Sequence, residues 1–236
     1  MTQFRAVLFD AGDTLIRLSG RGADVLHRAA ARLGAGTLDP AEADKVWQTV
    51  LHRASTPEEL AKGRDLSLGR HREIWTELYA AAGCEDLAPG LSEELYTQTV
   101  NPSSWEAFPD TVPTLEAIRR ANVRIGVLSD TGFDLRPVLD ALSITPWIDV
   151  LQMSFEFGVC KPDATTFRSA CEQLGANPAE TLMVGDNPLT DGGAVTAGLA
   201  VYLLPPPQTT ALSPRGLSAV VPLLTSAGQP AGGLFD

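Results

Sequence analysis

Five short runs of mainly apolar residues recur along the chain, and the hydrophobic positions within them follow one another without regular alternation. A strand needs such a run when helices cover both faces of its sheet, whereas a strand with one wet face alternates apolar and polar residues. We therefore predict five buried strands, at residues 6–9, 123–128, 148–153, 181–184 and 200–204.

Helical periodicity fills the segments between these runs. In the stretch 164–174, Phe167, Cys171 and Leu174 fall at i, i+4 and i+7, and Gly175 stands where a helix is expected to end. Alternation of strands with helices predicts a parallel sheet with right-handed crossovers. The predicted fold class is therefore α/β, with a doubly wound, Rossmann-like core.

The segment that follows the first strand has a different pattern, because its apolar residues recur at helical spacing only and glycines and prolines separate the stretches. We interpret residues 17–101 as an inserted helical cap domain, which leaves residues 1–16 and 102–236 as the α/β core. One continuous α/β domain would need a sheet without strands across a third of the chain. The three apolar stripes of the insertion are Leu26, Ala29, Ala30 and Leu33; Val46, Trp47, Val50 and Leu51; and Ile74, Trp75, Leu78, Tyr79 and Ala82.

The aromatic and histidine residues of this insertion have simple structural interpretations. Trp47 and Trp75 fall on the apolar stripes, so we expect them to pack in a core rather than to stack on a substrate. His27, His52 and His71 are scattered, which favours surface or internally satisfied side chains over metal ligands.

The C-terminal tail carries a weaker pattern than the rest of the chain. Residues 217–224 are expected to form a short helix that lies back on the sheet, and the Gly/Pro-rich stretch 228–236 is expected to be mobile.

Charge and cysteine content narrow the possible partners and the compartment. The chain has 18 Lys and Arg against 29 Asp and Glu, a net charge of -11. Such a surface repels phosphate backbones and anionic lipid, so we expect no nucleic-acid or membrane partner. Three cysteines without a C-x-x-C pair, no run long enough to span a membrane and no signal-peptide pattern predict a cytoplasmic protein.

Polar residues stand where the predicted strands end. Asp10, Ser129 and Asp186 follow three of the apolar runs, and Lys161 lies in the loop after another. The carboxyl ends of parallel strands meet at one edge of the sheet, where ligands bind. Carboxylates that hold a hard divalent cation, together with a hydroxyl and an ammonium group, suit phosphoryl chemistry.

Four segments at these positions resemble the signature of the haloacid dehalogenase-like hydrolase superfamily. They are residues 9–15 (FDAGDTL), 128–130 (LSD), 161–162 (KP) and 185–191 (GDNPLTD), and the resemblance covers residues 4–204. The helical insertion resembles the C1-type cap of that superfamily. The DTL and GDN triplets, with Trp105 ahead of Pro109 and Asp110, look most like its rhythmically-expressed-gene-2-like branch.

The resemblance implies a role for each matching residue. Asp10 would be the nucleophile that forms an aspartyl-phosphate, Ser129 would donate to a phosphoryl oxygen, and Lys161 would balance the charge. A Mg²⁺ ion would be held by Asp10, the Gly12 carbonyl and Asp186, with Asp191 holding a water on the metal. On the residues alone, the alternative roles are an N-cap of the next helix for Asp186 and a turn residue for Ser129.

The sequence departs from the usual signature at Gly12. Most phosphatases of this superfamily carry a second aspartate there, which protonates the leaving oxygen and contributes roughly 10²–10⁴-fold. Gly12 has no side chain for this task, and Asp13 stands one position further on. Asp13 is either a displaced acid and base or a residue that tolerates the turn conformation.

We therefore predict a Mg²⁺-dependent hydrolase, a phosphatase that acts on a small phosphorylated molecule. A 2-haloacid dehalogenase would use the same Asp10 on carbon and needs neither the metal nor an acid at Gly12. A non-catalytic binding protein on this scaffold is also consistent with the missing acid. A phospho-acceptor receiver domain shares the residue types but would not carry the insertion.

Overall fold

The computed structural model describes residues 4–20, 22–205 and 211–225. Its centre is a five-stranded sheet with the strand order β5-β4-β1-β6-β7, in which every neighbouring pair is parallel. The predicted parallel sheet is thus confirmed, with strand ends shifted by up to two residues. The strands are β1 Ala6–Phe9, β4 Arg124–Ser129, β5 Val150–Met153, β6 Thr181–Gly185 and β7 Ala200–Leu203.

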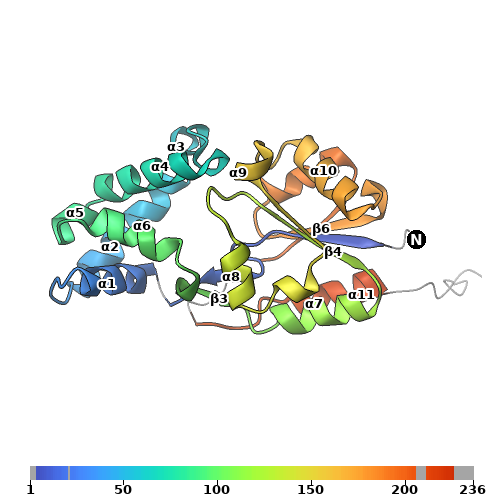
Figure 1. Ribbon diagram of the computed structural model, residues 1–236, viewed down its shortest axis with the longest axis horizontal. Coiled ribbons are helices and arrows are strands. Elements are labelled where there is room, and N and C mark those ends of the chain that lie inside the picture. Colours follow the sequence, from blue (N-terminus) through green and yellow to red (C-terminus); the bar gives the residue numbers. More distant parts are fainter. Residues whose placement is uncertain (1–3, 21, 206–210, 226–236) are drawn as a thin grey trace, which may run out of the picture.

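Helices cover both faces of this sheet, which explains its continuous apolar runs. Figure 1 shows α7 (Thr111–Arg120) and α11 (Val220–Thr225) on one face and α10 (Ala164–Leu174) on the other. Along β1, Val7 and Phe9 join the cluster under α7, whereas Leu8 joins the cluster under α10. The predicted tail helix is present as a 3₁₀ turn, Leu217–Ala219, that leads into α11, whereas residues 228–236 lie outside the described part.

The register of the central strands aligns their carboxyl ends. Phe9 of β1 pairs with Val127 of β4 and with Val184 of β6. The residue after Phe9 therefore lies close to the ends of both neighbouring strands. This alignment is what brings residues from distant parts of the sequence to one edge.

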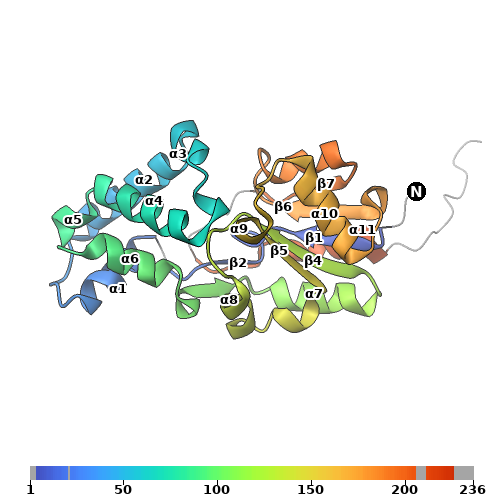
Figure 2. The same ribbon diagram turned by 45° about the horizontal axis from the view of Figure 1, so that its top comes forward.

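Residues 22–99 form the second part of the molecule, which contains only helices (Figures 1 and 2). They share their own apolar cluster, in which the side chains of Leu26, Leu78 and Leu95 are buried. Asp39 caps α2 by accepting from the backbone N–H groups of residues 41 and 42, and Pro40 opens the helix. The helices are α1 Gly22–Arg32, α2 Pro40–Ala54, α3 Pro57–Ala61, α4 Leu68–Ala81, α5 Cys84–Leu87 and α6 Leu91–Thr99, with short 3₁₀ turns at Arg64–Leu66 and Pro102–Ser104.

Two features of this region differ from the sequence prediction. The chain enters and leaves the helical part through an antiparallel pair, β2 (Ile16–Leu18) and β3 (Trp105–Ala107), neither of which was predicted. These three-residue strands are too short to show a period. Leu33 and Leu51, predicted on buried stripes, are 41% and 48% exposed. Neither lies where the helices meet their shared core.

The smaller helices of the core flank the strand ends. They are α8 Arg136–Ala141 and α9 Ser154–Phe157, together with 3₁₀ turns at Thr145–Trp147, Pro178–Glu180 and Asp191–Ala197. Among the described residues, no helix is both long and apolar enough to cross a membrane.

Gly126 in β4 lets α10 approach the sheet. A Cβ atom there would lie 2.7 Å from the Leu8 side chain and 3.1 Å from that of Leu174. We expect Gly126→Ala to lower the free energy of unfolding by about 1–3 kcal/mol, the usual effect of overpacking a core. Gly69→Ala is the matched control, because its Cβ meets nothing within 4 Å and it lies in α4, where alanine is the better helix former. Urea unfolding of the two variants would measure both; equal effects would contradict the packing argument.

Candidate active site

Lys161 occupies the centre of the site at the carboxyl ends of the strands. Its ammonium Nζ donates to Asp10 Oδ1 and to Asp191 Oδ1, each at 2.6 Å. The side chain is only 3% exposed, so these contacts form with little water around them. The two carboxylates, together with Asp130, raise the pKa of Lys161 far above its usual range against the opposing effect of burial. Lys161 is therefore a permanent positive charge.

Asp10 directly follows β1, and its backbone N–H donates to Val184 O at 2.9 Å. Its Oδ1 is engaged by Lys161. Burial raises the pKa of Asp10 to about 6, although Lys161 opposes the shift, and the carboxylates of Asp191 and Asp186 add to it. A carboxylate with this much negative charge around it favours an added cation.

Asp191 holds the loop after β6 in place. Its Oδ2 accepts from the backbone N–H groups of Asp186 and Asn187, at 3.1 and 3.0 Å, while its Oδ1 accepts from Lys161. Gly185 leaves room for this carboxylate, because a Cβ at Gly185 would collide with the Asp191 side chain. Both oxygens of Asp191 thus already have donors, which suits an indirect contact with a metal better than a direct one.

Asp186 completes an acidic cluster with Asp10 and Asp191. One carboxylate oxygen from each of the three lies within 4.8 Å of the others. Burial raises the pKa of Asp186 to about 6, and repulsion from Asp13 and Asp191 adds to the effect. Carboxylate oxygens are the ligands that hard divalent cations prefer. The donor set therefore fits a divalent cation, held by Asp10 and Asp186.

Ser129 and Asp130 lie at the end of β4, and both line the same cavity as Asp10. Ser129 is buried and its side chain belongs to the cavity wall. Asp130 accepts the backbone N–H of Lys161 with both carboxylate oxygens, at 3.1 Å. Burial raises the pKa of Asp130 to about 6. Asp130 positions the Lys161 segment, a role that sequence reasoning missed although the residue stands next to Ser129.

The turn after Asp10 contains Gly12 and Asp13. Asp13 has a left-handed backbone with φ of 53°, its N–H donates to Ile16 O at 2.8 Å, and its carbonyl accepts from Arg215 Nε at 2.6 Å. Asp13 is exposed along the cavity, yet desolvation by the protein around it raises the pKa of its carboxyl group. The positive charges of Arg215 and Arg17 oppose this shift. The backbone contacts of Asp13 therefore stabilise the turn. Its carboxylate is close enough to that of Asp186 to repel it.

A cavity of about 720 Å³ connects this charged floor with the helical part. All seven residues predicted for the site line it together: Asp10, Gly12, Asp13, Ser129, Lys161, Asp186 and Asp191. The structure thus brings the whole predicted set to one place.

Several cavity residues from the helical part were not predicted. Trp47 and Trp75 pack against the apolar cluster of the helical part, as expected, but they also line the cavity, and so does Arg64. His71 is buried and internally satisfied, which was one of the two alternatives predicted for it. Its Nδ1 lies 2.9 Å from the Tyr96 hydroxyl, and burial lowers its pKa to about 4. It also lines the cavity. Helical periodicity marks an apolar face but not what that face meets.

His71 packs against the core through Gly132, in the loop that follows Asp130. A Cβ at Gly132 would collide with the imidazole ring. A second contact lies nearby, where Ser154 Oγ of α9 donates to the Asp65 carbonyl at 2.6 Å. These contacts hold the helical part over the strand ends.

Comparison with known proteins identifies similar sequences and structures among hydrolases. Residues 4–197 match the haloacid dehalogenase-like hydrolase family. The human "haloacid dehalogenase-like hydrolase domain-containing protein 3" is 27% identical over 214 residues, which cover 87% of this chain and 84% of that protein. The pyrimidine 5'-nucleotidase YjjG of Escherichia coli is 40% identical over 101 residues, 41% of this chain and 44% of its own. A solved dehalogenase structure aligns with a TM-score of 0.68 at 23% identity, covering 96% of this chain and all of that one, and supports the fold.

The acidic cluster generates a prediction that links pH to cation binding. The pKa values of Asp10, Asp130 and Asp186 are raised from 3.8 to about 6 in the folded protein. The stability associated with their protonated forms is fully present below about pH 4 and is lost as the pH rises through about 6. Without a divalent cation, the melting temperature should therefore fall across this window.

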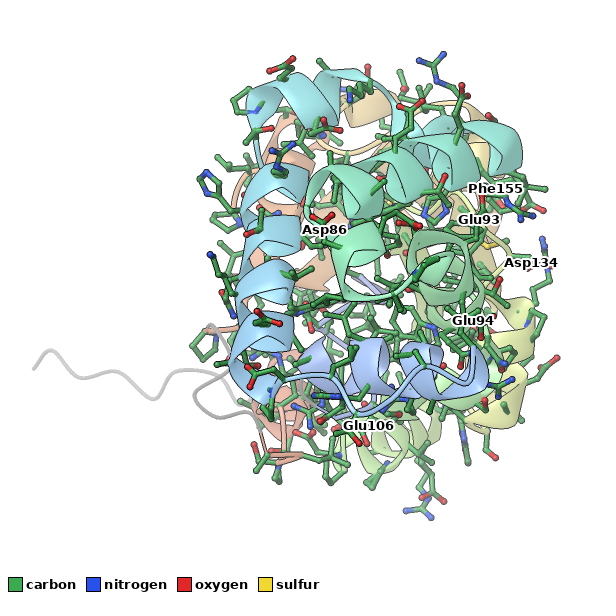
Figure 3. The ribbon with its side chains drawn as sticks, turned by 90° about the vertical axis from the view of Figure 1, so that its left-hand side faces the viewer. Asp86, Glu93, Glu94, Glu106, Asp134 and Phe155 are labelled. Carbon is green, nitrogen blue, oxygen red and sulfur yellow. The ribbon has the colours of Figure 1, made fainter. Side chains whose placement is uncertain are left out.

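Mg²⁺ should reverse that loss above pH 6 and have little effect at pH 4.5. At 100 times its dissociation constant it would add about 2.7 kcal/mol, roughly 5–10 °C in Tm for a chain of this size. Thermal unfolding with Mg²⁺ or EDTA at both pH values measures the effect. Asp186→Asn should abolish the Mg²⁺ shift, whereas Asp86→Asn, on the exposed surface of α5 (Figure 3), should retain it. A Mg²⁺ shift that survives in Asp186→Asn would contradict the site.

Proposed function

The chain belongs to the haloacid dehalogenase-like hydrolase family, and we propose that it is a Mg²⁺-dependent phosphatase that acts on a small phosphorylated molecule. The observation that carries the proposal is the cluster of Asp10, Asp186 and Asp191 around Lys161. Three carboxylates against one ammonium group leave an excess of negative charge. A divalent cation would offset this excess and would then favour a phosphate dianion.

In the proposed reaction Asp10 is the nucleophile. Its Oδ1 is held by Lys161, which leaves Oδ2 to attack phosphorus in line. The bond from phosphorus to the leaving oxygen breaks with its electron pair, and an aspartyl-phosphate forms on Asp10. Water then attacks the phosphorus, releases inorganic phosphate and regenerates the carboxylate.

The remaining residues position and neutralise the phosphoryl group. Ser129 would donate its hydroxyl to one phosphoryl oxygen, and Lys161 would balance the charge of another. Bound Mg²⁺, held by Asp10, Asp186 and the Gly12 carbonyl and by Asp191 through a water, would supply further positive charge at these oxygens.

We propose that residues 17–101 act as a cap domain and that residues 1–16 and 102–236 form the catalytic core. The cavity supports this division, since the core supplies its acidic cluster and Lys161, and the helices supply further lining residues such as Trp47 and Trp75. Cys84, Cys160 and Cys171 are all free, which supports the proposed cytoplasmic location.

A 2-haloacid dehalogenase is the second candidate, and the observation that favours it is Gly12. A halide leaves without a proton, so such an enzyme needs no acid at this position. A non-catalytic binding protein would be consistent with the same feature. Incubation with 4-nitrophenyl phosphate or 2-chloropropionate, each with Mg²⁺ or EDTA, separates the three. Mg²⁺-dependent phosphate release supports the phosphatase, metal-independent chloride release the dehalogenase, and neither product a binding protein.

Asp10→Asn tests the nucleophile. The amide keeps the size of the side chain but removes the attacking charge, so phosphate release should fall by about 10³-fold or more. Circular dichroism should show the same folded protein. Asp140→Asn, the same chemical change on the exposed surface of α8, should retain full activity. Wild-type turnover in Asp10→Asn would show that another residue attacks phosphorus.

The lack of a carboxylate at Gly12 should make the rate depend on the leaving group. Nitrophenolate departs without a proton, whereas an alkoxide needs one, so aryl and acyl phosphates should react much faster than sugar phosphates. Gly12→Asp should narrow the difference in rate between aryl and sugar phosphates, because the new carboxyl group could supply the proton. The side chain has room, since nothing lies within 4 Å of its Cβ.

Asp13→Asn distinguishes the two roles left open for Asp13. It should widen the gap between aryl and alkyl phosphates if the Asp13 carboxyl group supplies the proton. It should change only the melting temperature if Asp13 serves the turn. Initial rates on 4-nitrophenyl phosphate and glycerol phosphate provide the readout. Equal, high rates on both substrates in the wild type would contradict the role assigned to Gly12.

A further inference from the structure

The cavity that contains Asp10 also has an aromatic wall. Trp47 of α2 and Trp75 and Tyr79 of α4 line it from the helical part, and Trp105 of β3 and Phe133 line it from the core. The cavity of about 720 Å³ is in the range of sites for whole metabolites, far larger than a phosphoryl group needs. The phosphoryl chemistry proposed above uses none of these rings.

The ring of Trp75 has an aromatic neighbour and a cationic neighbour. Its ring centroid lies 5.4 Å from that of Tyr79, and the Arg64 guanidinium carbon lies 4.8 Å from it. On the core side, the Trp105 and Phe133 centroids are 6.1 Å apart. Aromatic rings at these separations attract one another, and a ligand ring at a similar distance would be attracted in the same way. The wall therefore suits a flat aromatic group better than a flexible polar one.

Two buried donors in this wall have no hydrogen-bond partner among the described residues. They are Trp75 Nε1 and Arg64 Nε. Arg64 is held in place by another atom, Nη1, which donates to Ala54 O at 2.7 Å. Buried polar groups in folded proteins almost always have partners, so an acceptor is missing beside both donors.

The carboxylate beside Arg64 does not supply that acceptor. Asp65 Oδ2 lies 3.6 Å from Arg64 Nε, too far for a hydrogen bond. The other carboxylate oxygen of Asp65 lies 3.7 Å from His71 Nε2, and its backbone carbonyl accepts from Ser154. Trp75 Nε1 and Arg64 Nε are shielded from water, so pairing with a ligand would involve a small rotation of either side chain.

We infer, resting on the proposed function, that the substrate is a phosphate ester whose alcohol portion carries an aromatic ring with an oxygen acceptor on its edge. The ring lies among Trp47, Trp75 and Phe133. The acceptor, a carbonyl or carboxylate oxygen, pairs with Arg64 Nε and Trp75 Nε1. The phosphoryl group lies on Asp10 at the cavity floor.

The first experiment compares esters that release primary alcohols, so that leaving-group basicity stays nearly constant. Benzyl phosphate and cyclohexylmethyl phosphate differ in aromaticity at similar size, and 4-carbamoylbenzyl phosphate adds the acceptor. We expect kcat/KM to rise about 3–10-fold from the saturated to the aromatic ring and about 10-fold more with the acceptor. Equal values for all three esters would overturn the inference.

Variants separate the ring from the donor. Trp75→Phe keeps an aromatic ring and removes only the N–H, so it should lose part of the preference for the carbamoyl ester and keep the preference for benzyl over cyclohexylmethyl. Arg64→Gln should likewise reduce the carbamoyl preference. Arg72→Gln is the control, because Arg72 pairs with Glu93 on the exposed face seen in Figure 3. A carbamoyl preference that persists unchanged in both Trp75→Phe and Arg64→Gln would contradict the assignment of the donors.

Binding measurements distinguish failure of this inference from failure of the proposed function. If no ester, including 4-nitrophenyl phosphate, is hydrolysed, the phosphatase proposal fails. Calorimetry with benzylphosphonate, cyclohexylmethylphosphonate and 4-(phosphonomethyl)benzamide then tests the cavity alone. Tighter binding of the aromatic and carbamoyl compounds supports the aromatic site, and equal or undetectable binding of all three overturns it.

Discussion

The ion pairs of Lys161 are the constraint on which the rest of the structure depends. A buried ammonium group is costly unless carboxylates surround it, and Asp10 and Asp191 both contact Lys161 at 2.6 Å. Those carboxylates follow β1 and β6, so the pairing requires adjacent strands to end at the same level. It also requires the Lys161 segment to return to that edge, where Asp130 holds its backbone. Removal of the Lys161 charge would leave both buried carboxylates without their shared counterpart.

Much of this arrangement could be predicted from the sequence, for a physical reason. Buried parallel strands are continuous apolar runs, and a run that stops at a polar or charged residue marks a strand end. Asp10, Ser129 and Asp186 were found in this way. Parallel topology then brings the strand ends together, whatever their separation in sequence. Phe9 pairs with Val127 and Val184 as this argument requires.

The helical part shows what sequence patterns leave undetermined. Trp47 and Trp75 have the spacing of core residues and do pack against the helical cluster, but the pattern does not reveal that they also line a cavity, because a face that meets a cavity can be as apolar as one that meets a helix. Arg64 sits in a 3₁₀ turn with no periodicity to mark it. The β2–β3 pair is defined by partners 89 residues apart, such as Arg17 and Glu106, and three residues carry too little pattern to reveal it.

The two walls of the cavity act on each other through the dielectric environment. Burial is the largest influence on the carboxyl groups of Asp10, Asp130 and Asp186, and it raises the pKa of each to about 6. Burial of these carboxyl groups therefore creates the demand for positive charge at the floor. The same exclusion strengthens every charge contact made there. Under the proposed function, selectivity for an apolar ligand body and reactivity toward an anionic group would have one physical source, since a ligand that fills the aromatic side would displace water that otherwise screens Lys161 and its carboxylates.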